Sequence, residues 1–201
     1  TNAGLHLPAM ASEAGIEFDL MDVCEIFRKT PYIADLKPGG RYVAKDMFEV
    51  GGVGVVIKEL LKGGYMHGDC MTVTGKTLAE NYVDVEFPED QDVIRPITNP
   101  LSSTGGVVGL MGNLAPQGAI VKIAGLEKIT FTGPARVFER EEDCLQAVLA
   151  KEYKEGDVLV IRNEGPKGGP GMREMLSTTG ALYGQGMGDK VALITDGRFS
   201  G

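Results

Sequence analysis

The 201-residue sequence predicts an α/β fold, with the helical end of an N-terminal α/β domain followed by part of a β-rich, barrel-like domain. Three observations lead to this prediction. Apolar residues recur at helical spacing as far as residue 64. From residue 107 onward, short apolar runs alternate with glycine and proline, which is typical of closely spaced strands. Two later runs, 158–162 and 191–195, each lead directly into a glycine-rich, charged segment.

Residues 1–84 are predicted to be mainly helical and to form the end of the first domain. Pro8 is expected in the first turn of its helix or at a bend, because proline lacks the backbone N–H that a helix interior requires. The pair Gly63–Gly64 is expected to end the fourth helix. The apolar face of the second helix is predicted to comprise Leu20, Val23, Ile26 and Phe27. The predicted helices are 2–14, 19–28, 42–52, 53–64 and 76–82, with a short strand at 71–74.

Residues 85–104 are acidic, contain prolines and lack periodicity, which favours a linker before a second domain at 105–201. In that domain, 139–150 begins with acidic residues, as is favourable at a helix N-terminus. Its apolar side is predicted to comprise Cys144, Leu145, Val148 and Leu149. The predicted strands are 107–111, 119–125, 128–133, 135–138, 158–162 and 191–195, with helices at 139–150 and 176–185.

Composition excludes several classes of protein. The net charge of −8 and the pI of about 4.9 argue against binding to nucleic acid or to an anionic membrane surface. No apolar run approaches the roughly 20 residues that span a bilayer, and no signal peptide is visible. The three cysteines, Cys24, Cys70 and Cys144, form no CxxC pair and suit a reducing compartment. We expect a bacterial cytoplasm or the interior of an organelle.

Charged residues follow the two late strands. The first loop, EGPKGGPG, carries Glu164 and Lys167, and the second, TDGRFSG, offers Asp196, Arg198 and Ser200 on a turn whose glycines permit positive φ. Ligands of sheet proteins collect where strands end in loops, so the two segments together indicate a functional surface. Either loop alone would more simply be an ordinary surface turn.

The amino-acid sequence of these loops, EGPKGGPGMREM and ALITDGRFSG, resembles that of the dihydroxy-acid dehydratase family. The resemblance continues upstream, in order, through TNAGLHL, ADLKPGGRYV, HGDCMTVTGKTLAEN, DVIRP, GNLAPQGAIVKIAG and FTGPARVF. Its coverage of essentially the whole chain makes it specific. The family pattern begins before Thr1 and continues after Gly201, so the resemblance implies an internal fragment.

The resemblance implies an enzyme that removes water from a 2,3-dihydroxy-3-methyl carboxylic acid to give a 2-keto acid, in valine and isoleucine biosynthesis. It implies a magnesium ion with Glu174 as a ligand and Ser200 as the base that takes the C2 proton. It also implies a homodimer and an iron–sulfur cluster, [2Fe–2S] or [4Fe–4S], whose cysteines lie upstream of this chain. The fragment alone is therefore predicted to be inactive.

The chemistry of the residues agrees with these roles. Carboxylates such as Glu174 suit magnesium, which prefers hard oxygen ligands. A serine is a poor base unless nearby cations stabilise its alkoxide, so Ser200 needs metal ions, with Lys167 or Arg198 as candidate helpers. For each of these two residues, a solvated cation on a turn is the simpler interpretation.

Other interpretations remain open at this stage. A sugar-acid dehydratase acting on gluconate or xylonate is the alternative within the class, and a non-catalytic anion-binding module is the alternative outside it. Gly75, Lys76 and Thr77 match the end of a phosphate-binding P-loop, but Cys70 stands where its first glycine must be, so that motif is rejected. His6, His67 and Cys70 receive no role. Phe48 stands where the family commonly has histidine or tyrosine, so only an apolar packing role is expected there.

Overall fold

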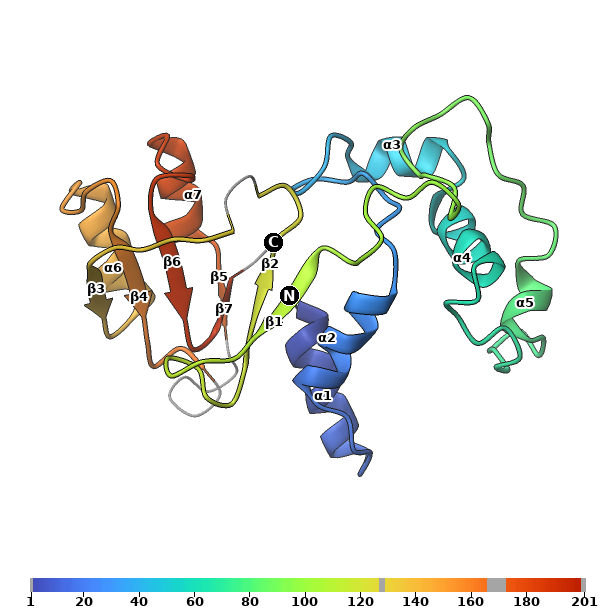
Figure 1. The fold of residues 1–201 in the computed structure, drawn as a ribbon, viewed down its shortest axis with the longest axis horizontal. Coiled ribbons are helices and arrows are strands. Elements are labelled where there is room, and N and C mark those ends of the chain that lie inside the picture. The colour runs from blue at the N-terminus through green and yellow to red at the C-terminus, as the bar shows by residue number, and fades with distance from the viewer. Residues whose placement is uncertain (1, 127–128, 166–172, 200–201) are drawn as a thin grey trace. The chain divides into compact units, whose positions relative to one another are not determined.

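The computed structural model describes residues 2–126, 129–165 and 173–199, and it mixes helices with mainly parallel strands (Figure 1). The predicted α/β class is therefore confirmed. The chain divides into two compact units, Leu7–Leu126 and Thr1–His6 with Glu127–Gly201. Among the residues that the structure describes, no helix is both long and apolar enough to cross a membrane.

The unit Leu7–Leu126 contains the helices predicted at 19–28, 42–52, 53–64 and 76–82, with somewhat different bounds. Its core contains Val55, Val93 and Ile94. Asp19 caps the second helix by accepting hydrogen bonds from the backbone N–H of Met21 and Asp22. The elements are the part of α1 (Asn2–Glu13, which contains Pro8) from Leu7 onward, α2 (Leu20–Lys29), α3 (Ala44–Glu49), α4 (Gly52–Lys62), α5 (Leu78–Asn81) and the antiparallel pair β1 (Val107–Leu110) and β2 (Ala119–Lys122).

The unit Thr1–His6 with Glu127–Gly201 contains a parallel sheet in the order β3-β4-β6, whose strands lie side by side in Figure 1. Helices connect these strands, since parallel neighbours require crossover connections. A second, two-stranded parallel sheet joins β5 to β7. The elements are β3 (Ala135–Phe138), α6 (Glu141–Leu149), β4 (Val158–Ile161), β5 (Glu174–Met175), α7 (Ser177–Gly184), β6 (Ala192–Thr195) and β7 (Arg198–Phe199).

The core of this unit lies between the central strand and the two helices. Leu159 and Ile161 of β4 are fully buried and pack with Val148 of α6, Leu182 of α7 and Met175 of β5. Helices α6 and α7 also contact each other. Both helices therefore cover the face of the sheet to which Leu159 and Ile161 point.

Several details differ from the sequence prediction. Met71 forms only an isolated bridge with Thr77 rather than a strand, and residues 129–133 of the predicted strand 128–133 form no strand. Ile26 and Leu149, both expected on buried faces, are 54% and 56% exposed, whereas Ala147 is buried. Helical spacing predicts which apolar residues share one face of a helix, but the packing of neighbouring elements decides how many of them are buried from solvent. The described strands form small separate sheets and no closed barrel, so the barrel-like arrangement stays a prediction.

Candidate functional site

The two charged loops begin side by side. Strands β4 and β6 pair in parallel, with Ile161 opposite Thr195, so their carboxyl ends lie at the same edge of the sheet. Arg162 therefore starts one loop next to Asp196, which starts the other. This is the edge at which ligands collect in open α/β sheets.

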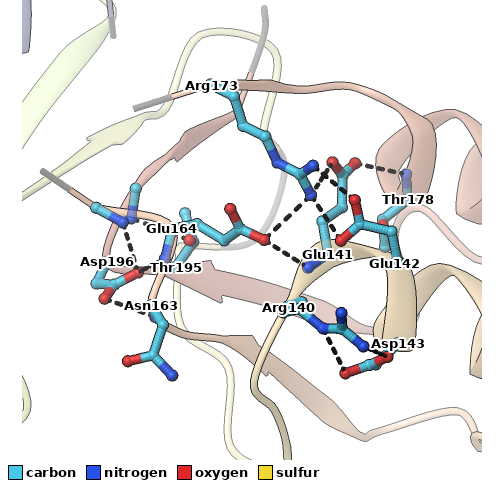
Figure 2. A network of polar contacts seen from close by, with 12 residues as sticks. Arg140, Glu141, Glu142, Asp143, Asn163, Glu164, Arg173, Thr178, Thr195 and Asp196 are labelled. Carbon is cyan, nitrogen blue, oxygen red and sulfur yellow. Dashed lines mark hydrogen bonds and ion pairs between the residues drawn. The ribbon is translucent and has the colours of Figure 1, made fainter. Parts of the chain in front are cut away.

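The carboxylate of Asp196 binds the loop that follows β4 (Figure 2). It accepts hydrogen bonds from the backbone N–H groups of Asn163 at 2.9 Å, Glu164 at 3.0 Å and Gly165 at 3.1 Å. The chain turns at Asn163, whose φ is 64°, a value that asparagine tolerates better than most residues. One side chain thereby satisfies three backbone donors and fixes the two loops to each other.

Gly165 and Gly197 make this close approach possible. A Cβ atom at Gly165 would lie 2.4 Å from the backbone oxygen of Asp196, and one at Gly197 would lie 2.8 Å from that of Glu164. Neither glycine has a positive φ. The turn does not use the positive φ that Gly197 permits; the absence of a side chain matters there instead.

A second polar cluster surrounds Arg173, whose guanidinium points toward three carboxylates in Figure 2. It forms a bidentate pair with Glu142, at 2.6 and 2.9 Å, and contacts Glu164 at 3.1 Å and Glu141 at 3.3 Å. Hydrogen bonding to Arg173 lowers the pKa of Glu142 to about 2, and the same bond raises the pKa of Arg173. Glu141 and Glu164 are both buried, and a buried carboxylate needs such a partner.

The buried carboxylates also cap helices. Neither α6 nor α7 has a side-chain hydrogen bond from its own N-cap residue. Glu164 accepts the backbone N–H of Glu141, the first residue of α6, at 2.8 Å. Glu141 in turn accepts the backbone N–H of Thr178, in the first turn of α7, at 3.5 Å. The negative charges stabilise the positive ends of both helix dipoles, so the cluster ties the loop after β4 to both helices.

Glu174 and Arg198 meet on the small sheet formed by β5 and β7. The two residues are paired in register, and Nη1 of Arg198 donates to Oε1 of Glu174 at 2.9 Å. The side chain of Glu174 is 52% exposed, whereas that of Arg198 is 11% exposed. Within the described part of the chain, Nε of Arg198 is buried and lacks a hydrogen-bond partner. Lys167 and Ser200 lie outside the described residues.

Glu174 fits one position of a magnesium site, because it offers hard carboxylate oxygens on a half-exposed side chain. The described ranges contain no group of three or more His, Cys, Asp or Glu residues able to hold a metal ion. The cysteines do not fit an iron–sulfur cluster: Cys24 and Cys144 are buried in the interior, and Cys70 is exposed. Burial raises the pKa of Cys144 to about 12, so it stays a thiol.

Sequence reasoning missed the role of Arg173 and the capping by Glu141 and Glu164. The acidic start of the helix at 139–150 was a partial signal, since it indicated a dipole-stabilising residue but not its partner. Only the parallel pairing of β3 and β4 brings the start of α6 to the loop that follows β4.

Models of known families match both parts of the chain. The dihydroxy-acid/6-phosphogluconate dehydratase C-terminal model matches residues 92–201, and the corresponding N-terminal model matches residues 1–81. This chain belongs to the dihydroxy-acid/6-phosphogluconate dehydratase family. The resemblance inferred from the loop motifs is thereby confirmed.

Individual relatives agree with the family assignment. The chain is 72% identical to a dihydroxy-acid dehydratase of Parvibaculum lavamentivorans, over 100% of this chain and 35% of that protein. It is 70% identical to dihydroxy-acid dehydratase 2 of Mesorhizobium japonicum, over 100% of this chain and 34% of that protein. It is 58% identical to a dihydroxy-acid dehydratase of Synechococcus, over 100% of this chain and 36% of that protein. The chain thus spans about a third of the length of these relatives.

Proposed function

We propose that the protein is a dihydroxy-acid dehydratase, a hydro-lyase that converts 2,3-dihydroxy-3-methyl carboxylic acids to 2-keto acids in valine and isoleucine biosynthesis. The observation that carries this proposal is the 72% identity, along the whole chain, to a protein of that name. Arg198 pairs with Glu174 in the ladder between β5 and β7 and donates a hydrogen bond to its carboxylate, which supports Glu174 as a site residue.

Glu174 would hold a magnesium ion through its carboxylate. When bound, magnesium supplies positive charge that stabilises the enediolate-like anion formed when C2 loses its proton. Arg198 orients the Glu174 carboxylate, because its guanidinium is largely buried and donates to one carboxylate oxygen. The remaining magnesium ligands are not assigned to residues of this chain.

Ser200, the residue after Phe199, would be the base that takes the proton from C2. Its hydroxyl is barely ionised at neutral pH, so a nearby cation must stabilise the alkoxide. Arg198, two residues earlier in the sequence, and Lys167, in the other loop, are the candidates in this chain. Ser200 would then return this proton to the hydroxide that leaves C3, so that one water is lost, and the resulting enol tautomerises to the 2-keto acid.

The whole protein is further proposed to carry an iron–sulfur cluster, of either the [2Fe–2S] or the [4Fe–4S] type. Cys24, Cys70 and Cys144 do not fit as its ligands, so no step is assigned to the cluster here. In the same proposal, residues 1–84 and 105–201 belong to two domains joined by the linker 85–104. Residues 105–201 would form the first part of a β-rich, barrel-like domain of the whole protein. The whole protein would be a homodimer. It would be located in the bacterial cytoplasm or in the interior of an organelle.

The experiment that tests this function compares two substrates with the full-length enzyme. We expect faster turnover, as kcat/KM, of 2,3-dihydroxy-3-methylbutanoate than of gluconate or 6-phosphogluconate. The sugar acid is the relevant competitor because the matching family model covers 6-phosphogluconate dehydratases as well. Faster turnover of the sugar acid would replace the proposed substrate, and turnover of neither would contradict the assignment.

A further inference from the structure

The residues on either side of Glu174 are anchored on one face of β5. Met175 is fully buried in the core formed with α6 and α7. Arg173 binds carboxylates at the N-terminus of α6, as Figure 2 shows. Successive side chains of an extended segment point to opposite faces. Arg173 and Met175 therefore face the helices, and Glu174 faces the other way, toward Arg198.

The small sheet cannot supply this orientation alone. Strands β5 and β7 pair over two residues each, Glu174 with Arg198 and Met175 with Phe199. So short a ladder makes few backbone hydrogen bonds, and isolated two-stranded pairs are marginally stable in water. The direction in which Glu174 points therefore depends on the anchors before and after it, in addition to the ion pair with Arg198. Met175 supplies an apolar anchor and Arg173 a polar one.

The polar anchor consists of several charged contacts made by one side chain. Arg173 uses the planar fork of its guanidinium in a bidentate pair with Glu142, and it also contacts the buried Glu141 and Glu164. Bidentate, charge-assisted hydrogen bonds fix geometry as well as adding energy. Without Arg173, two buried carboxylates would lose their cation, and they would repel each other at the start of α6. The backbone at residue 173 is therefore held to the start of α6 and to the loop after β4.

We propose that Arg173 is a positioning residue for metal binding, which holds β5 so that the Glu174 carboxylate is presented toward the magnesium ion. The proposal rests on the proposed function, in which Glu174 is a magnesium ligand. Arg173 itself touches neither metal nor substrate, because its guanidinium is occupied on the opposite face of the strand by Glu141, Glu142 and Glu164. Its effect is transmitted through one peptide unit.

The test measures magnesium binding to the full-length enzyme by titration calorimetry, without substrate. Arg173→Ala is expected to weaken magnesium binding by roughly tenfold or more, the loss typical of groups that orient a metal ligand. Arg173→Lys, which keeps the charge but not the fork, is expected to give a smaller loss. Arg140→Ala is the matched control, because Arg140 is 67% exposed and pairs with Asp143 near the same helix end. It should bind magnesium like the wild type.

A second measurement separates positioning from ligation. Excess magnesium should restore most of the kcat of the Arg173 variants, whereas Glu174→Ala should remain impaired because the ligand itself is gone. If Arg173→Ala does not fold, magnesium affinity is measured in Arg173→Lys and Glu142→Gln instead. Both variants weaken the ion pair between residues 142 and 173 but leave a cation next to Glu141 and Glu164. Wild-type magnesium affinity in the folded Arg173 variants, with weakened binding in Glu174→Ala, would overturn this proposal alone. Unchanged affinity in Glu174→Ala would overturn both it and the ligand assignment.

Discussion

Arg198 on β7 holds the carboxylate of Glu174 on β5, with 2.9 Å between Nη1 and Oε1. The two residues stand opposite each other in the parallel ladder, so the ion pair and the backbone register support one another. Arg198 is largely buried while Glu174 is half-exposed. The cation is thus the buried partner of this pair, and the carboxylate is the solvent-exposed one.

Replacing Glu174 by alanine should weaken magnesium binding by at least about tenfold and reduce kcat/KM of the full-length enzyme, because the proposed metal ligand is lost. Calorimetric titration with magnesium and steady-state kinetics provide the measurements. Glu155→Ala is the control, since Glu155 is 68% exposed and forms a surface pair with Lys190. Equal magnesium affinity in the wild type and in Glu174→Ala would remove Glu174 from the metal site.

Ser200→Ala should lower kcat by about a hundredfold to ten-thousandfold, the usual contribution of a positioned general base. Magnesium affinity should stay at the wild-type value, because the serine is assigned to proton transfer. Ser103→Ala, at an exposed position in the other unit, serves as the control for a lost hydroxyl. A Ser200→Ala enzyme with normal turnover would show that another group takes the proton.

Gly165→Ala should destabilise the protein by about 1–3 kcal/mol, the usual cost of overpacking. The added methyl group would lie 2.4 Å from the backbone oxygen of Asp196 and would force the two loops apart. Gly180→Ala in α7 is the matched control, because a Cβ atom added there would meet nothing within 4 Å; alanine at this position should be neutral or stabilising. Denaturant unfolding monitored by circular dichroism measures both, and equal stability of the two variants would contradict the close-contact explanation.

The stability of the fold should depend on the charge of Glu142 at acidic pH. Its pKa is lowered from 4.5 to about 2 by Arg173, so the folded state favours the ionised form. The corresponding stabilisation is complete above pH 4.5 and is lost as the pH falls toward 2. Unfolding midpoints of the wild type and Glu142→Gln should therefore differ at pH 6 and converge near pH 2 to 3. A constant difference across that range would show that the ion pair does not contribute. The effect should be modest, because Glu142 is 56% exposed and solvent screens the pair.

The 201-residue piece, purified alone, should show no dehydratase activity even with added magnesium and iron. Its three cysteines do not fit an iron–sulfur cluster, and Glu174 is its single assigned magnesium ligand. The measurement is keto-acid formation from 2,3-dihydroxy-3-methylbutanoate, with the full-length enzyme assayed in parallel. Detectable turnover by the piece would mean that the chemistry needs fewer groups than proposed.

Local patterns predicted the long elements well. The capped helix after Asp19, the helix ending at Gly63 and the β-branched strands at 158–162 and 191–195 are all present, because each depends on residues close together in the sequence. The strands β5 and β7 were missed, since two residues are too few to show a period. Their existence depends on pairing with each other.

The site was predicted in part. The convergence of the two loops follows from strands that end in charged segments, and the structure places Asp196 against the loop after β4. The partners of Arg173 could not be predicted, because Glu141 and Glu164 reach it only through the parallel order of β3, β4 and β6. The spacing of these residues along the chain does not indicate that Arg173 contacts Glu141 and Glu164. The roles assigned to Glu174, Ser200, Lys167 and Arg198 remain predictions.

The ion pair between Glu164 and Arg173 joins the residues that bracket the segment 166–172. The pair therefore holds the start of β5 beside the loop that follows β4. A change at Glu164 or Arg173 would therefore disturb the first turns of α6 and α7 as well as the start of β5, so any redesign of this unit should leave both residues in place.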